Sequence, residues 1–157
     1  MKLLKKRRGF SMITAIVVIV LMATVAVFVL SLSGKVVKSS TAQYQHEQAV
    51  LYAKSYTEYA ILAVTGNNRA DKCLQTIKGS IGSSPINGKG YEIRTEISYI
   101  GPASVVGNCA SKRILSTNVN TTQTPLTIII DAYVNYKDPD NPSGPWFTVH
   151  RRTIQKI

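Results

Sequence analysis

Three groups of side chains in this 157-residue sequence could do chemistry, and the first is a pair of cysteines. Cys73 and Cys109 are the only two, and two thiols can pair as a disulfide in an oxidising compartment. The chain has no Cys-x-x-Cys spacing and only two histidines, so neither a zinc site nor a redox site is indicated.

The second group offers oxygen ligands in a proline-rich loop. Asp138, Asp140 and Asn141 carry the carboxylate and amide oxygens that calcium binds in proteins. The same residue types also form plain turns, because Asp and Asn bond their own backbone and Pro sets the bends. The loop therefore predicts either a calcium site or a turn, and apart from calcium we expect no cofactor.

The third group lies in a predicted last strand, residues 146–154, where aromatic and basic side chains gather. Arg151 and Arg152 are candidate nucleic acid contacts, because arginines neutralise phosphates and aromatic rings stack on bases. Strand alternation, however, sends Arg151 to one face and Arg152 with His150 to the other. The two arginines are explained equally well as charges that prevent this strand from pairing with the sheet of another molecule.

These side chains do not form a catalytic constellation. His46 lies beside Glu47 in a predicted helix, His150 lies in a predicted strand, and neither accompanies a nucleophile motif. We therefore expect that the chain is not an enzyme.

The chain that must position these groups contains an apolar segment near its start, residues 10–32, and this segment has no charged side chain. As a helix it spans roughly 35 Å, enough for a bilayer core. The formal net charge of +11 is uneven, because five basic residues precede the segment and only Lys35 and Lys38 follow closely. This bias predicts a cytoplasmic N-terminus with the remainder outside. A signal peptide cut before Gly34 and a plain signal anchor are the alternatives.

The junction Lys6-Arg7-Arg8-Gly9-Phe10 ends a short basic leader in Gly and starts the apolar segment abruptly at Phe. It resembles the leader of type IV pilins and type II secretion pseudopilins. In that family a membrane-embedded peptidase cuts after the Gly and methylates the new amino-terminal Phe. The resemblance implies a cleaved leader over residues 1–9, processing at Gly9 and Phe10, and a helix over 10–32 that lies in the membrane or in a filament core.

Thr14 departs from the family pattern. Most members carry Glu there, and its carboxylate is thought to neutralise the amine of a neighbouring subunit's Phe. Pairing can fix the stagger between subunits, because an unpaired buried charge is strongly unfavourable. Without that carboxylate, the resemblance implies a minor subunit, for example one at the filament tip.

The resemblance also implies partners and a location. The partners are other pilin or pseudopilin subunits, prepilin peptidase and the bacterial inner membrane, which the chain crosses once before it enters a periplasmic or extracellular filament. Some pseudopilins hold calcium in a loop of the sheet, and some related filaments import DNA during competence, so both hypotheses above stay open.

Beyond the membrane segment the pattern predicts an amphipathic continuation of the helix over residues 33–65. No Pro occurs between Phe10 and Val64, and Gly66 is a stop signal. Small and Tyr side chains recur at helical spacing and indicate a face that packs on a sheet. These residues are Ala49, Tyr52, Ala53, Tyr56, Ala60 and Ala63.

Residues 66–157 contain all six prolines and alternate with the strand period at 91–99, 126–136 and 146–154. This predicts a β-rich extracytoplasmic head and an α+β fold, in which a long N-terminal helix packs on a small antiparallel sheet. An outside location favours a Cys73–Cys109 disulfide that joins the loop after the helix to the loop after the first predicted strand.

Two functions follow from the sequence. The first is a structural minor pilin or pseudopilin of a type IV pilus, a type II secretion system or a competence filament. The alternative is a membrane-anchored module whose head binds DNA, polysaccharide or a protein.

Overall fold

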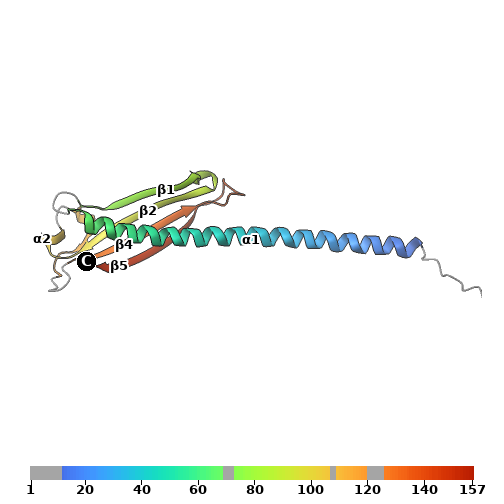
Figure 1. Ribbon diagram of the computed structural model, residues 1–157, viewed down its shortest axis with the longest axis horizontal. Coiled ribbons are helices and arrows are strands. Elements are labelled where there is room, and N and C mark those ends of the chain that lie inside the picture. Colours follow the sequence, from blue (N-terminus) through green and yellow to red (C-terminus); the bar gives the residue numbers. More distant parts are fainter. Residues whose placement is uncertain (1–11, 69–72, 107–108, 120–125) are drawn as a thin grey trace, which may run out of the picture. The chain divides into compact units, whose positions relative to one another are not determined.

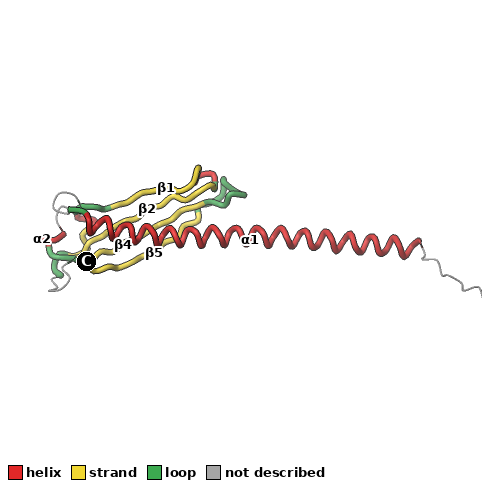
Figure 2. Tube along the Cα trace, in the orientation of Figure 1, coloured by secondary structure: helices red, strands yellow, loops and turns green. Residues whose placement is uncertain are grey.

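The computed structural model describes residues 12–68, 73–106, 109–119 and 126–157. The chain divides into two compact units, Met1–Gln43 and Tyr44–Ile157, and each is described by itself. Figures 1 and 2 show the elements. The expected processing site at Gly9 and Phe10 lies outside the described residues.

Helix α1 runs from Met12 to Gly66, so its predicted end at residue 65 is confirmed to within one residue. Within the second unit, α1 buries a stripe of small and branched side chains at three- and four-residue steps. The buried residues are Ala49, Ala53, Thr57, Ala60 and Val64. The predicted stripe is confirmed at its alanines at 49, 53 and 60, whereas the contributions of Thr57 and Val64 were not predicted.

The second unit contains one sheet, whose four long strands are antiparallel neighbours in the order β1-β2-β4-β5. Their bounds are β1 Thr76–Ser84, β2 Lys89–Ile100, β4 Thr127–Tyr136 and β5 Phe147–Lys156. The short β3, Ile114–Ser116, pairs in parallel with the end of β2, which β1 does not reach. The remaining short elements are η1 Pro85–Asn87, α2 Ala103–Val106 and η2 Ser111–Arg113.

The α+β prediction is confirmed, but the sheet has five strands where the sequence indicated three. The strand β1 was not predicted because glycines interrupt its apolar alternation. A Cβ added at Gly79 would collide with the ring of Tyr56, so a side chain there would require Tyr56 to shift. The tyrosine of α1 therefore covers the strand where a strand side chain would otherwise lie.

The core lies between α1 and one face of the sheet. Alternate residues of β2 point into it, namely Ile93, Thr95, Ile97 and Tyr99. Residues of β4 with the same alternation complete it, namely Ile128, Ile130, Ala132 and Val134. The small residues of α1 let the helix approach these strands closely, and the other face of the sheet carries mostly polar side chains.

Candidate functional site

The first candidate site is the apolar part of α1 in the first unit. From Met12 to Leu32 its large side chains are exposed, and the helix is long and apolar enough to cross a membrane. Thr14 lies in this segment and is exposed. The segment supports a single-pass membrane anchor by its length and composition.

The disulfide prediction is confirmed. Cys73 and Cys109 are bonded, with their Cα atoms 4.8 Å apart. The bond joins the residues just before β1 to the residues after α2, and Cys73 belongs to the core cluster with Tyr99 and Val106. The disulfide therefore fixes the connections at one end of the sheet.

The second candidate site is the outer face of the sheet, which points away from α1. Strand register aligns its side chains in rows that cross four strands. One row consists of Lys78, Arg94, Tyr133 and His150. The next consists of Thr76, Glu96, Asp131 and Arg152. The rows place basic and aromatic groups beside two carboxylates.

Asp131 is the most buried charged group of this face, with 8% of its surface exposed. Its Oδ1 lies 2.7 Å from Nε2 of His150 and accepts a hydrogen bond from Nε of Arg152 at 2.7 Å. Its Oδ2 accepts a second bond from Arg152 Nη2 at 2.9 Å. The Arg152 hydrogen bonds, reinforced by His150, hold the pKa of the Asp131 carboxyl below its usual value although burial opposes them.

Glu96 forms a second ion-pair group on the same face. It accepts a hydrogen bond from Nη1 of Arg113 at 2.9 Å and lies 3.3 Å from Nη1 of Arg94. The hydrogen bond from Arg113 lowers the pKa of the Glu96 carboxyl, against the effect of burial. The two carboxylates are directly opposite each other in the register, and arginines balance their charges.

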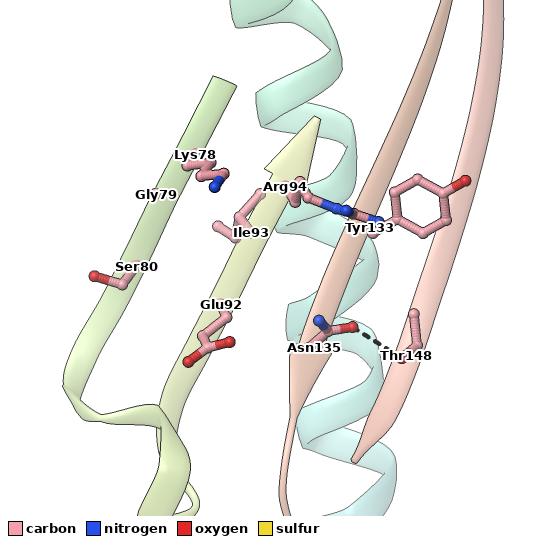
Figure 3. A pocket seen from close by; sticks show the side chains of 9 residues that line it. All are labelled: Lys78, Gly79, Ser80, Glu92, Ile93, Arg94, Tyr133, Asn135 and Thr148. Carbon is pink, nitrogen blue, oxygen red and sulfur yellow. Dashed lines mark hydrogen bonds between the residues drawn. The ribbon is translucent and has the colours of Figure 1, made fainter. Parts of the chain in front are cut away.

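Tyr133 links the two groups. Its ring stacks on His150 with centroids 4.5 Å apart, and the Arg94 guanidinium lies 5.4 Å from its centroid. Beside this stack, the outer face holds an open depression of about 680 Å³. Figure 3 shows the polar side chains that line it, with Asn135 accepting a hydrogen bond from Thr148. The depression can offer hydrogen bonds and charges of both signs to a polar ligand.

The structure separates the two predicted nucleic acid contacts. Arg152 lies on the outer face in its pair with Asp131, whereas Arg151 lies on the opposite face, level with Ala132 of the core. The alternation predicted from the sequence is confirmed, and the two guanidinium groups do not share one surface.

In the predicted calcium loop, the hydrogen bonds are those of a turn. Asp138 Oδ1 accepts a bond from the backbone N–H of Asp140 at 2.9 Å, and the Asp138 carbonyl accepts one from the N–H of Asn141 at 3.1 Å. Among the described residues no group of three His, Cys, Asp or Glu side chains is placed to hold a metal ion. The calcium hypothesis stays a prediction.

The Asp131–Arg152 and Glu96–Arg113 pairs were not predicted from the sequence. A signal for the first was present, because Asp131 is the single charged residue in the predicted strand 126–136. Such a charge needs a partner when it is buried.

Comparisons with protein-family models, with curated proteins and with solved structures gave no significant match for this chain.

Proposed function

We propose that the chain is a minor pilin or pseudopilin, processed after Gly9, that enters a filament of a type IV pilus, type II secretion or competence system. The observation that carries this proposal is α1, which combines an exposed apolar segment with a stripe that packs on an antiparallel sheet. The leader junction at Gly9 and Phe10 supports the processing step.

In this function the apolar segment first holds the chain in the inner membrane and then packs against the same segment of other subunits. In lipid no hydrophobic driving force acts between helices, so helix association is favoured by the close packing of small residues. Ala15, Ala23 and Ala26 provide such positions. The disulfide then stabilises a head that works outside the cytoplasm.

The mature mass tests the proposal. The chain is expressed with a prepilin peptidase and measured by intact-mass spectrometry. We expect a chain that starts at Phe10 and carries one additional methyl group. A Gly9→Leu variant should keep the leader, whereas a Lys2→Gln variant, changed far from the junction, should be processed normally. An intact Met1 or a start at Gly34 overturns the proposal.

The depression on the outer face favours a second candidate, a membrane-anchored binding module for a polar ligand such as DNA, polysaccharide or protein. The two functions differ in what they need from residues 10–32. A binding module should keep its function when another signal anchor replaces this segment, whereas a filament subunit should lose incorporation. Both outcomes can be followed in one cell-based complementation experiment.

A further inference from the structure

The two edges of the sheet differ in how they are protected against a further strand. The strands β1 and β5 are the edges, because each pairs with one neighbour among the described residues (Figure 1). Charged side chains at an edge discourage pairing with another chain. The edge β5 carries Arg151, Arg152 and Lys156. The edge β1 has Lys78 as its single charged residue, so β1 is the edge that is left open.

Backbone groups of β1 point to this open edge. The N–H of Ile97 donates a hydrogen bond to the Gln75 carbonyl at 3.0 Å, so these opposite residues are bonded across β1 and β2. In an antiparallel ladder, bonded pairs alternate with residues whose backbone groups point away from the neighbouring strand. Those residues are Thr76, Lys78 and Ser80. The register of β1 shifts only at residues 82–84, so the stretch before them offers a regular row of donors and acceptors.

Beside the same edge, α1 and β1 enclose an open groove of about 440 Å³. Its walls include the rings of Tyr56 and Tyr59 from α1 and the side chain of Ile77 from β1. Tyr59 is 56% exposed, and its ring lies edge-on to that of Tyr56 with centroids 6.3 Å apart. Because Ile77 packs on the core under α1, a residue opposite it on an added strand would point into the groove. The groove suits an apolar side chain.

The other face of this edge carries a positive charge. Lys78 is exposed, lies opposite Arg94 in the register, and has no ion-pair partner among the described residues. Arg94 lies 3.3 Å from the carboxylate of Glu96. The exposed carboxylate of Glu92 is on β2, about 4.8 Å further from the edge than β1. A residue opposite Lys78 on an added strand is therefore closest to that lysine, and an acidic side chain is favoured there.

The charge of the second unit argues against a second copy as the added strand. Of the 19 basic and 8 acidic side chains of the chain, twelve basic and all eight acidic ones lie from Tyr44 onward. Two identical units therefore repel each other. The strand β5 of a second copy would also bring its own basic residues beside Lys78. A partner of different sequence with acidic residues fits the edge better.

We propose that β1 accepts an extended segment of another protein as an added antiparallel strand. Apolar residues of this segment point into the groove at Tyr59, and acidic residues alternate with them and lie opposite Lys78. Main-chain hydrogen bonds supply affinity, and the alternation of apolar and acidic residues supplies specificity. The proposal uses only the second unit and rests neither on filament assembly nor on the binding-module function.

A fluorescent peptide tests the proposal on the full-length chain in detergent micelles. The peptide has nine residues, the length of β1, and alternates glutamate with valine. We expect its fluorescence anisotropy to rise as the chain is added, above the value measured with empty micelles. A peptide that alternates lysine with valine should bind about tenfold more weakly, because its charges lie opposite Lys78.

Methyl groups on the peptide backbone show whether the peptide binds as a strand. Only every second amide of an added strand faces β1. In antiparallel pairing the glutamate opposite Lys78 exchanges backbone bonds with it, so methylation of the glutamate amide nitrogens should weaken binding at least tenfold. Methylation of the valine amide nitrogens, which point away from β1, should change binding little. Equal binding of the two methylated peptides, or tighter binding of the glutamate-methylated one, overturns the proposal.

Two pairs of variants locate the binding site on β1. Lys78→Glu should reverse the preference between the two peptides, whereas Lys156→Glu, an exposed lysine on the same face of β5, should behave like the unchanged chain. Tyr59→Ser removes a wall of the groove and should weaken binding of the glutamate peptide about tenfold. Its control is Tyr44→Ser, at a tyrosine of α1 that is 63% exposed and does not line the groove. Circular dichroism checks that all four variants are folded.

Contrary outcomes identify other kinds of binding. Equal binding of the glutamate peptide to the unchanged chain and to Lys78→Glu means that the net positive charge attracts the peptide non-specifically, and it overturns the proposal. A dimer of the chain that the peptide dissociates means that a second copy occupies β1, and it also overturns the proposal. Neither outcome changes the mature mass, so the proposed function is tested separately.

Discussion

Asp131 on β4 and Arg152 on β5 face each other in the strand register and form a two-point ion pair on the outer face of the sheet. Two parallel bonds between guanidinium and carboxylate fix both side chains, and His150 adds a third contact to the same carboxylate. The pair links an edge strand to the strand beside it.

Replacing Asp131 with Asn should destabilise the head by about 1 kcal/mol, because the two-point pair is lost at a side chain that is 12% exposed while solvent screens its more exposed partner Arg152. Chemical unfolding followed by circular dichroism measures the change. Glu92→Gln, an exposed carboxylate on the same face, is the control and should change stability much less. Equal effects of the two substitutions would contradict a structural role for the pair.

Stability should fall in acid, because the pKa values of the Asp131 and Glu96 carboxyls are lowered in the folded chain. Above the ordinary carboxyl pKa of about 4 both groups are ionised in either state, and their full contribution is present. As the pH falls through the ordinary pKa of the unfolded chain and then through the lowered pKa of the folded chain, the unfolded chain binds more protons than the folded chain does. The stabilisation is therefore lost.

Thermal unfolding midpoints between pH 7 and pH 3 measure this dependence. The double variant Asp131→Asn with Glu96→Gln should start less stable at pH 7 and lose less on acidification than the unchanged chain. Parallel curves for the two proteins would show that other carboxyls cause the acid sensitivity.

Removing the disulfide by the double substitution Cys73→Ser with Cys109→Ser should lower the free energy of unfolding by about 2–4 kcal/mol. The two cysteines are 36 positions apart in the sequence, and without their bond the unfolded chain has more conformational entropy. Calorimetry of the variant, and of the unchanged chain with and without reductant, measures the loss. A reductant effect on the double variant itself would point to a cause other than this bond.

Gly88→Ala should destabilise the contact between η1 and the β4–β5 loop. Gly88 has φ of +74° and lies against Pro139, so a side chain meets both backbone strain and a steric clash there. The matched control is Gly34→Ala, at a helical position with open space, which should leave stability unchanged or raise it by about 0.5–1 kcal/mol. Hydrogen exchange at residues 86–90 measures the local effect.

Under the proposed filament function, Thr14→Glu distinguishes a tip subunit from a shaft subunit. A tip subunit has no neighbour ahead whose amine needs a carboxylate, so the added charge would carry a penalty on the order of 2.5–3.5 kcal/mol. We expect fewer incorporated subunits in the variant, counted by immunoblot of sheared filaments. Improved incorporation would assign the chain to the shaft, and Thr14→Ser is the control for the substitution itself.

Elements with strong periodicity were predictable. The alternation from Tyr91 to Tyr99 placed β2 and its buried face correctly, since every second side chain packs on the helix. The disulfide was also predictable, because two cysteines allow one pairing. By contrast, β1 was not predictable from its own residues. The glycine at position 79 of this strand is explained by a contact with Tyr56 of α1, which is distant in the sequence.

The outer face of the sheet was less predictable than the core. Asp131 is visible as a charge in an apolar strand, but its partners His150 and Arg152 depend on the register between β4 and β5. That register follows from the loop between these strands and from the packing on α1, which the strand pattern alone does not encode. The depression of Figure 3 requires four strands to be aligned at once.

The Cys73–Cys109 bond closes a covalent ring that contains all of β1 and all of β2, and β2 pairs with neighbouring strands on both of its sides. A protease that cuts once inside this ring releases no fragment, because both pieces remain joined through sulfur. The nicked head can keep its central strands in place, and the cut becomes visible only on a reducing gel. Under the proposed function, in which the head lies outside the cytoplasm, this ring would protect it against a single cleavage.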